Sequence, residues 1–296
     1  MPELPDVTVY VERLQAHLQG SVLRDVRLAS PFLLRSVEPP LAAVKDRRVE
    51  GFRRLGKRII FVLEGDHFLV LHLMVAGRLK LEPKPGAKIP GKVGLAAFDF
   101  DAHTLLLTEA STKKRASLYA VKGEAGLVAH ERGGLEVMQA DLQAFTAALT
   151  AKNHTLKRAL TDPRIFSGIG NAYSDEILFE ARLSPLKLTQ RLEADEVARL
   201  FAATQACLAR WTEVLRAEAG DGFPKKVTAF REDMAVHGKY RQPCPVCGTK
   251  VQRIAYAENE TNYCPTCQNE GRLLKDRSLS RLLKDDWPKT VDELER

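Results

Sequence analysis

Two pairs of closely spaced cysteines constrain this chain more strongly than any other feature. Cys244 and Cys247 form one Cys-x-x-Cys pair, and Cys264 and Cys267 form a second pair after a spacer of sixteen residues. Four thiolates at this spacing are typical of a tetrahedral structural zinc site, while an iron–sulfur centre and a pair of disulfides are the alternatives. The segment from Pro224 to Arg253, which leads into and past the first pair, is rich in Lys and Arg. A basic hairpin held by a metal is well suited to contact nucleic acid.

The first residues of the chain combine a proline with a carboxylate. If Met1 is removed, which the small Pro2 permits, the chain begins with a secondary amine beside Glu3. An α-amino group has a pKa near roughly 7.7–8.0, so a useful fraction is neutral and nucleophilic at physiological pH. A secondary amine that attacks an aldehyde carbon forms a permanently cationic iminium, which promotes eliminations β to a sugar carbonyl. Glu3 is the candidate general acid for opening the sugar ring, and the simpler alternative is that Pro2 only starts a helix.

Apolar residues at helical spacing follow this start. Pro5 suits a first helical turn, and Gly20 is a suitable stop. Between them, one apolar face recurs at intervals of three and four residues: Val7, Tyr10, Val11, Leu14 and Leu18. A buried helix of this kind holds Pro2 and Glu3 rigidly, as a nucleophile and its acid require.

From Val22 to about Val121 the sequence has the pattern of a β-sheet. Two apolar runs, at 59–63 and 68–73, flank a Glu-Gly-Asp turn and predict a hairpin of buried strands. Several short strands without intervening helices favour a β-sandwich or barrel that is capped by the N-terminal helix. Lys57 lies in a basic cluster just before the hairpin. It is either a functional cation or part of a solvated charged rim.

The second half of the chain is predicted to be helical. We expect a linker from Gly123 to Gly134 and helices from Asp141 to about Glu218, the last of which begins near Glu193. Cys207 falls on the apolar side of that last helix, so we expect it in the core rather than at a redox or metal site.

A glycine-rich turn interrupts these helices. Gly168, Gly170 and Asn171 predict a tight turn into a helix, with Asn171 as the N-cap. The free backbone amides at such a helix start form an anion site. Asp175 and Glu176 follow in the next turn, where their negative charges interact favourably with the positive end of the helix dipole.

The composition indicates a soluble globular protein with a polyanionic partner. The chain has 296 residues, a net charge of +7 and a sequence pI near 9.1. Excess positive charge favours association with nucleic acid. The sequence has no N-terminal targeting signal and no apolar run of membrane-spanning length, so we expect a cytoplasmic protein, associated with the nucleoid if the source is bacterial.

Five motifs in order resemble the formamidopyrimidine-DNA glycosylase/endonuclease VIII family, from Met1 to about Gln268. They are Pro2-Glu3-Leu4-Pro5, Leu55-Gly56-Lys57-Arg58, His72-Leu73 with Gly77-Arg78, Gly168-Ile169-Gly170-Asn171, and the cysteine pairs. The resemblance implies an α+β multidomain fold. Its parts are an N-terminal catalytic β-sandwich domain at 1–125, a helix–two-turns–helix DNA-binding domain at 135–222, a zinc finger at 236–268 and a C-terminal extension at 269–296.

The resemblance also implies a role for each motif in a monomeric DNA repair glycosylase and abasic-site lyase that carries structural Zn²⁺. Pro2 is implied as the Schiff-base nucleophile at C1′ of an extruded nucleotide, Glu3 as the acid at the ribose, and Lys57 as the catalytic lysine. Further residues are implied, or are candidates, for contacts with damaged or abasic DNA: Lys152, Lys157, Gly168, Gly170, Asn171, Lys114, Arg115 and Arg253.

The chain departs from the family pattern at several places. The Met that fills the gap left by an extruded base is replaced by Val75, which follows Met74. The later loop, from Thr108 to Ser117, lacks the family's Phe, and the finger arginine is replaced by Asn259. The tail beyond Gln268 lies outside the resemblance, and its segment 279–287 is expected to pack as a helix on the protein.

These departures lead to two expectations about activity. A weak wedge favours bases that are already unpaired, and loss of the finger arginine favours β-elimination over δ-elimination. The alternative is a damage-binding protein that keeps the fold and has lost turnover.

Overall fold

The computed structural model describes residues 1–225, 227, 231–256, 259–276 and 288–294. The chain forms two compact units, and each combines separate stretches of sequence. The first contains Met1–Arg132 and Trp211–Thr228, and the second contains Gly133–Arg210 and Ala229–Arg296. The boundary between them falls within the long helix α6 (Ala194–Ala219).

The first unit is built on an eight-stranded antiparallel sheet in the order β5-β7-β6-β1-β2-β3-β4-β8. Only two residue pairs join β1 to β2, so the sheet divides there into two halves that pack as a sandwich. The predicted hairpin at 59–63 and 68–73 is confirmed as β3 and β4. The strands are β1 (Val22–Leu28), β2 (Arg47–Leu55), β3 (Arg58–Leu63), β4 (His67–His72), β5 (Gly77–Glu82), β6 (Gly94–Phe100), β7 (Thr104–Glu109) and β8 (Ser117–Lys122), with 3-10 turns η1 (Pro31–Leu33) and η2 (Leu41–Val44) between β1 and β2.

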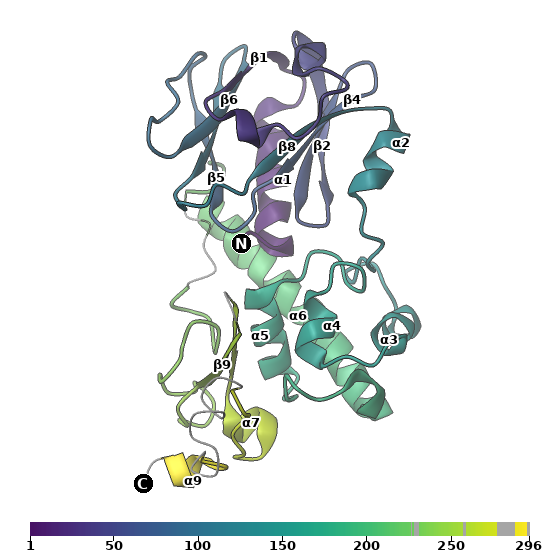
Figure 1. The fold of residues 1–296 in the computed structure, drawn as a ribbon, viewed down its shortest axis with the longest axis vertical. Helices are drawn as coiled ribbons and strands as arrows, with labels where there is room; N and C mark the ends of the chain where they lie inside the picture. The colour runs from purple at the N-terminus through teal and green to yellow at the C-terminus, as the bar shows by residue number, and fades with distance from the viewer. Residues whose placement is uncertain (226, 228–230, 257–258, 277–287, 295–296) are drawn as a thin grey trace. The chain divides into compact units, whose positions relative to one another are not determined.

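Helix α1 (Leu4–Leu18) packs beside β2 and closes the main core, as the apolar spacing predicted (Figure 1). Leu14 and Leu18 are fully buried, and Phe61 stacks on Phe98 across the sandwich with ring centroids 5.2 Å apart. Burial of each such leucine contributes about 1.5–3 kcal/mol, so a single helical face anchors the N-terminus firmly. Gly20 follows α1 with φ +82°, a left-handed conformation that suits glycine.

The predicted linker at 123–134 is not a simple linker. It contains α2 (Glu124–Leu127) and the 3-10 turn η3 (Val128–His130). Leu127 is buried against the outer face of the sheet, so the segment covers part of that face. The members of this smaller cluster are Ile60, Phe68, Val70, Val121 and Leu127.

The second unit begins with helices, as predicted. Phe145 and Phe166 stack with ring centroids 4.8 Å apart, and Phe201 of α6 contacts Phe145 at 5.1 Å. Cys207 is fully buried on α6, which confirms its assignment to the core. The helices are α3 (Leu142–Thr150), α4 (Leu156–Thr161), α5 (Asn171–Glu180), the 3-10 turn η4 (Thr189–Arg191) and the first part of α6.

The second unit also contains a small β-hairpin near the C-terminus. Strands β9 (Gln252–Tyr256) and β10 (Asn259–Tyr263) pair antiparallel, and α7 (Pro265–Asn269) follows β10. A short helix, α9 (Val291–Leu294), lies near the chain end, while the helix predicted at 279–287 lies outside the described residues. None of the helices in the described ranges has the length and apolar character that a membrane span requires.

Candidate active site and metal centre

The first residues of the chain are held in place by their own helix. Pro2 and Glu3 are buried, and Glu3 is the N-cap of α1. The backbone N–H of Glu3 donates to Oδ2 of Asp6 at 2.8 Å, and the Glu3 side chain accepts from the backbone of Asp6. This reciprocal capping box satisfies two helix-end amides and fixes the Glu3 carboxylate beside the start of the chain.

The terminal amine of the chain lies in surroundings that favour its neutral form. Burial lowers the pKa of the Met1 amino group from its ordinary value of 8.0. Glu3 opposes this shift, while the positive charges of Arg78 and Lys57 reinforce it. Desolvation and neighbouring cations both disfavour an ammonium ion, so an amine at this position is a better nucleophile than one in water.

Asp6 is the residue of this site that sequence reasoning missed. Its carboxyl group is buried, and burial, followed by the charge of Glu3, raises its pKa to about 7 despite the bond from the Glu3 amide. Asp6 also lines a cavity of about 380 Å³ together with the end of α6 and the segment around Phe223 and Lys225. The three-residue spacing of Glu3 and Asp6, which is that of a capping box, was the available signal.

Lys57 lies in the turn between β2 and β3, in the same neighbourhood as the terminal amine. Its charge acts on that amine and also on His72, at the end of β4. Burial is the main cause that lowers the pKa of His72 to about 4, and Arg58 and Lys57 add to it, so His72 is neutral at physiological pH. The charge of Lys57 therefore acts on the same terminal amine that the Glu3 carboxylate also influences.

The two loops that depart from the family pattern contain Met74 and Val75 in the first case and residues Thr108 to Ser117 in the second. Met74 adopts φ +53°, and Val75 beside it is 54% exposed. In the later loop, the buried Glu109 carboxylate accepts the backbone N–H groups of Arg115 and Ala116 at 3.0–3.1 Å. The Lys114 ammonium donates to the Glu109 carbonyl, so both predicted cations lie on a loop organised by one buried acid.

The glycine-rich turn leads into α5, but Asn171 does not cap it. Gly170 is the N-cap, with extended backbone angles, and Asn171 is already the first helical residue. A capping side chain must belong to the last non-helical residue, so the prediction was wrong by one position. Gly168 has φ +81°, which permits the tight turn. Lys152 is exposed, and its carbonyl accepts the Thr189 hydroxyl at 2.8 Å.

Lys157 points into the protein. Its ammonium donates to the Asn171 carbonyl at 2.7 Å and to Oδ1 of Asp175 at 2.5 Å, and its side chain is only 11% exposed. Asp175 also contacts Nδ1 of His237 at 2.8 Å and accepts from the Asn262 amide at 3.2 Å. Asp175 therefore does more than favour the helix dipole, because it joins three separate parts of the second unit.

Glu176 acts in the same way one residue further along. Its carboxylate accepts the backbone N–H groups of Ala235, Val236 and His237 at 2.8–2.9 Å. Burial raises its pKa, although these three bonds oppose the rise. The segment before the cysteine pairs is thus attached to α5, and sequence reasoning did not find this attachment.

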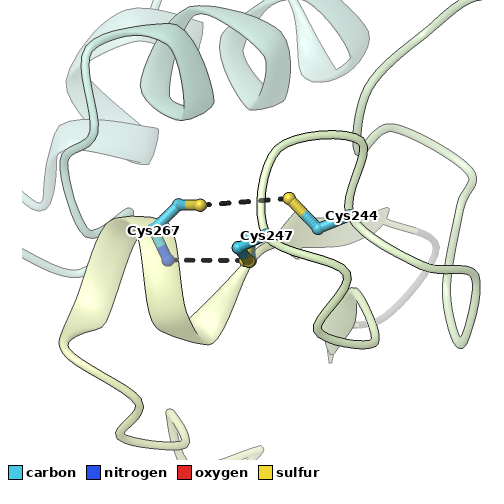
Figure 2. Close-up of side chains that lie close together, drawn as sticks. Cys244, Cys247 and Cys267 are labelled. Carbon is cyan, nitrogen blue, oxygen red and sulfur yellow. Dashed lines mark hydrogen bonds between the residues drawn. The ribbon is translucent and has the colours of Figure 1, made fainter.

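The four predicted cysteines converge on one point, and Figure 2 shows Cys244, Cys247 and Cys267 of this cluster. Their sulfur atoms all lie within 4.8 Å of one another, with Cys244 and Cys267 at 3.9 Å and Cys247 and Cys264 at 3.4 Å. Tetrahedral zinc–thiolate bonds of roughly 2.3 Å require sulfur atoms about 3.8 Å apart, so the cluster fits a structural metal ion. The sulfur separations greatly exceed a disulfide bond of about 2.05 Å.

Arg253 lies on β9, on the hairpin that follows the first cysteine pair. Its guanidinium lies 4.4 Å from the ring centroid of Tyr240 and 3.3 Å from a carboxylate oxygen of Glu260. The side chain is partly exposed, so its position leaves it accessible to a ligand.

Comparison with known proteins agrees with this architecture. Models of the formamidopyrimidine-DNA glycosylase N-terminal domain, its H2TH domain and the zinc finger found in FPG and IleRS match residues 1–115, 135–218 and 241–269. The formamidopyrimidine-DNA glycosylase of Thermus thermophilus is 34% identical over 284 residues, which cover 92% of this chain and 100% of the relative.

Solved structures show the same fold. The crystal structure of MutM (FPG) from Thermus thermophilus matches with a TM-score of 0.76 and 32% identity, over 91% of this chain and 100% of that one. The complex of Lactococcus lactis Fpg with DNA containing an abasic site matches with a TM-score of 0.78 and 22% identity, over 90% and 99% of the two chains. The β-sandwich, the helical domain, the four-cysteine finger and these matches together show that the chain belongs to the formamidopyrimidine-DNA glycosylase/endonuclease VIII family.

Proposed function

We propose that this protein is a DNA glycosylase and abasic-site lyase of base-excision repair, which acts through a Schiff base at Pro2. Family membership supports glycosylase activity, since the relatives that match along nearly the whole chain carry that name. The observation that carries the lyase proposal is the N-terminus itself. Pro2 is buried beside the Glu3 carboxylate, which a capping box fixes at the start of a helix with a fully buried face, and burial lowers the pKa of the Met1 amino group that precedes Pro2.

The chemistry follows from these groups. After Met1 is removed, the neutral Pro2 nitrogen attacks C1′ of the damaged nucleotide, and the base leaves with the bonding electron pair and takes up the proton that the Pro2 nitrogen loses. Glu3 protonates the ring oxygen as the sugar opens, which leaves a cationic iminium at C1′. Loss of a C2′ proton then expels the 3′ phosphate, and hydrolysis of the iminium returns Pro2. Lys57 stabilises negative charge near the reacting sugar.

The cavity beside Asp6 is the proposed site for the extruded base. Its volume of about 380 Å³ falls in the usual range of small-ligand sites, roughly 300–1,000 Å³. Asp6 bonds the Glu3 amide and also lines the cavity, so a base held there lies close to the proposed acid. The aromatic ring of Phe223 offers a surface on which a base can stack.

DNA binding is proposed to use cations and amides from both units. Lys152, the amides after Gly168 and Gly170, and the α5 start at Asn171 offer phosphate contacts, and Arg253 extends them on the finger hairpin. Lys114 and Arg115 contact DNA from the later loop. Because its ammonium is already bonded to Asp175, Lys157 acts mainly by holding the start of α5 in place. We propose a monomer with zinc as the finger metal.

Covalent trapping tests the proposal. Borohydride added to the protein with abasic-site DNA reduces an iminium to a stable cross-link, and Pro2→Gly should reduce its yield at least tenfold. Pro5→Ala is the matched control, because it changes a proline of the same helix start and keeps the secondary amine of Pro2, and it should still trap. If the wild-type protein binds abasic DNA tightly and gives no cross-link, the lyase proposal is wrong and the protein binds damage without cleaving it.

A further inference from the structure

The outer face of the first unit ends in a group of cations. Side chains two residues apart on a strand share a face, so Arg58 lies on the same face as Ile60 of the small apolar cluster. His72 pairs directly with Arg58 across β3 and β4. The segment that covers this face adds His130 and Arg132, and the His130 ring contacts the Tyr119 ring with centroids 4.7 Å apart.

Arg58 is held in poor surroundings for a cation. Its Nε is buried and has no hydrogen-bond partner among the described residues. Burial lowers the pKa of Arg58, and the neighbouring charge of Arg132 lowers it further. The same two arginines lower the pKa of His130 after burial, so cations repel one another at this end of the face.

At the other end of the face, the arginine side chain is paired with an acid. Arg53 of β2 lies over the Phe68 ring at 5.3 Å and pairs with Glu124 of α2 at 2.8 Å. Arg53 therefore has an acid from the covering helix. Among the described residues, the charges that shift the pKa of Arg58 are those of Arg132 and Tyr119, and Arg58 in turn lowers the pKa of His72 and of His130. None of these four groups is an acid that balances Arg58 at neutral pH.

An unbalanced pair of arginines favours an anion. A guanidinium presents a planar fork of N–H donors that matches phosphate geometry, and bonds to a charged acceptor are about twice as strong as neutral ones. Arg58 also follows Lys57 directly in sequence, so the cations continue from the proposed active site along the sandwich. Lys57 and Arg58 both lower the pKa of His72, so a DNA strand that passes Lys57 approaches this group of cations.

We propose that Arg58 and Arg132 bind one phosphate of the DNA backbone beside the lesion, with Tyr119 and His130 forming the wall of this site. The proposal rests on the DNA glycosylase function above. It adds a contact outside the reacting nucleotide, so its loss should weaken binding and leave the chemistry intact.

A methylphosphonate scan tests the site. Each duplex carries a reduced abasic site and one uncharged methylphosphonate, placed at successive backbone positions. At one position near the lesion, wild-type affinity should fall about tenfold, as expected for loss of a charged hydrogen bond. Arg58→Gln should bind the all-phosphate duplex about tenfold more weakly and show no further loss at that position. Its plot of log affinity against log salt should be shallower by about 0.9.

The controls separate the outcomes. Arg132→Gln changes an exposed side chain, so it tests the same position without risk to the fold, and Arg58→Lys should restore part of the affinity. Arg53→Gln, on the same face, should leave the scan unchanged. Borohydride trapping should persist in Arg58→Gln. If the wild type itself gives no cross-link, the proposed lyase function is wrong, and this outcome is distinct from failure of the phosphate site.

Two results would overturn the site. The first is an equal methylphosphonate loss in wild type and Arg58→Gln at every position. The second is saturation of the Arg58-dependent effect by inorganic phosphate at constant ionic strength, with no position sensitive to methylphosphonate, which would assign the site to a small free anion.

Discussion

At the scale of single residues, Asp6 links the stability of the first unit to pH. Its pKa is about 7 in the folded protein against 3.8 ordinarily, so the folded state prefers the protonated carboxyl. Asp6 therefore contributes fully to the stability of the fold below about pH 4, and this contribution is lost as the pH rises through 7. The difference corresponds to roughly 4 kcal/mol at most.

Asp6→Asn should remove this dependence, because an amide does not ionise. We expect the urea midpoint of the first unit to decline from pH 4 to pH 8 in the wild type and to change much less in the variant. Trp211, which is buried in that unit, reports the transition in a Trp287→Phe background. Parallel curves for the two proteins would show that Asp6 does not titrate in this range.

We expect Asn259 to limit how far strand cleavage proceeds. An arginine at this place can hold the phosphate that leaves in the second elimination, whereas a neutral amide offers only a weak donor. Losing one such charge-stabilising contact typically costs about 3–4 kcal/mol, or ~10²–10³ in rate. The first elimination relies on the iminium and is expected to survive.

The wild type should therefore accumulate the 3′ unsaturated aldehyde of β-elimination on abasic DNA. Asn259→Arg should shift the products toward a gap with a 3′ phosphate, and Asn259→Gln is the control that lengthens the side chain without adding a charge. Gel analysis of 3′ ends over time distinguishes them. Rapid appearance of 3′ phosphate in the wild type would show that another residue, with Arg253 as the first candidate, supports the second step.

The residues that sequence reasoning found are those whose partners are close in sequence. Pro2 and Glu3 are adjacent, and the cysteine pairs have a fixed local spacing. The residues that it missed depend on contacts that only the fold creates. Asp175 meets His237 across 62 positions, and the Asp6 cavity needs residues from the far end of α6.

At the scale of elements, hydrophobic periodicity predicted helices and strands well and their ends less well. The α1 and β3–β4 predictions are confirmed because each has a complete apolar face that must be buried. The linker predicted at 123–134 does contain the division between the two units, at Arg132 and Gly133, but the short helix α2 within it was missed. One buried residue, Leu127, is too weak a pattern to indicate a helix. The prediction of Asn171 as the N-cap of α5 was wrong because Gly170, the residue before it, occupies that position. Glycine and asparagine are both suited to an N-cap, so the sequence alone does not distinguish the two.

The loop at Met74 and Val75 should limit which bases are extruded. Pushing a base out of an intact duplex costs a few kcal/mol, and a side chain that fills the gap offsets part of it. Val75 is exposed but short, so we expect preference for abasic sites, single strands and bubbles. Val75→Met adds buried surface worth about 1 kcal/mol, which is roughly five- to tenfold in rate.

Excision assays with matched substrates test this loop. Val75→Met should speed excision from a fully paired duplex and leave excision from a single strand unchanged, while Val75→Leu should fall between the two. Equal acceleration on both substrates, or efficient wild-type excision of a well-stacked oxidised purine opposite cytosine, would contradict the expectation.

At the scale of the whole molecule, the four-cysteine centre should support DNA binding more than global stability. The four cysteines belong to the second unit, so they lie outside the main core of the first unit. The apolar cluster around the cysteines is small. Folding of such a small module depends on its metal.

Cys244→Ser should therefore weaken DNA binding at least tenfold and keep most helical signal and the main melting transition. Removal of the metal from the wild type with a chelator should reproduce the effect, and Cys207→Ser serves as the control for loss of a thiol away from the cluster. Loss of the main transition in Cys244→Ser would show that the finger is not a separate module.

The first unit closes only when distant residues arrive. Val227 is buried in its main core and Phe223 packs against it, although both follow the second unit's helices in sequence. At about 5–20 residues per second, a ribosome needs roughly 10–50 s to synthesise that far. During this interval the N-terminal helix lacks the contact of Tyr10 with Phe223, so we expect Met1 to stay accessible for the removal that the proposed mechanism requires. Because the first unit is discontinuous in sequence, the proline nitrogen is expected to be exposed first and to be buried only after the later residues have been synthesised.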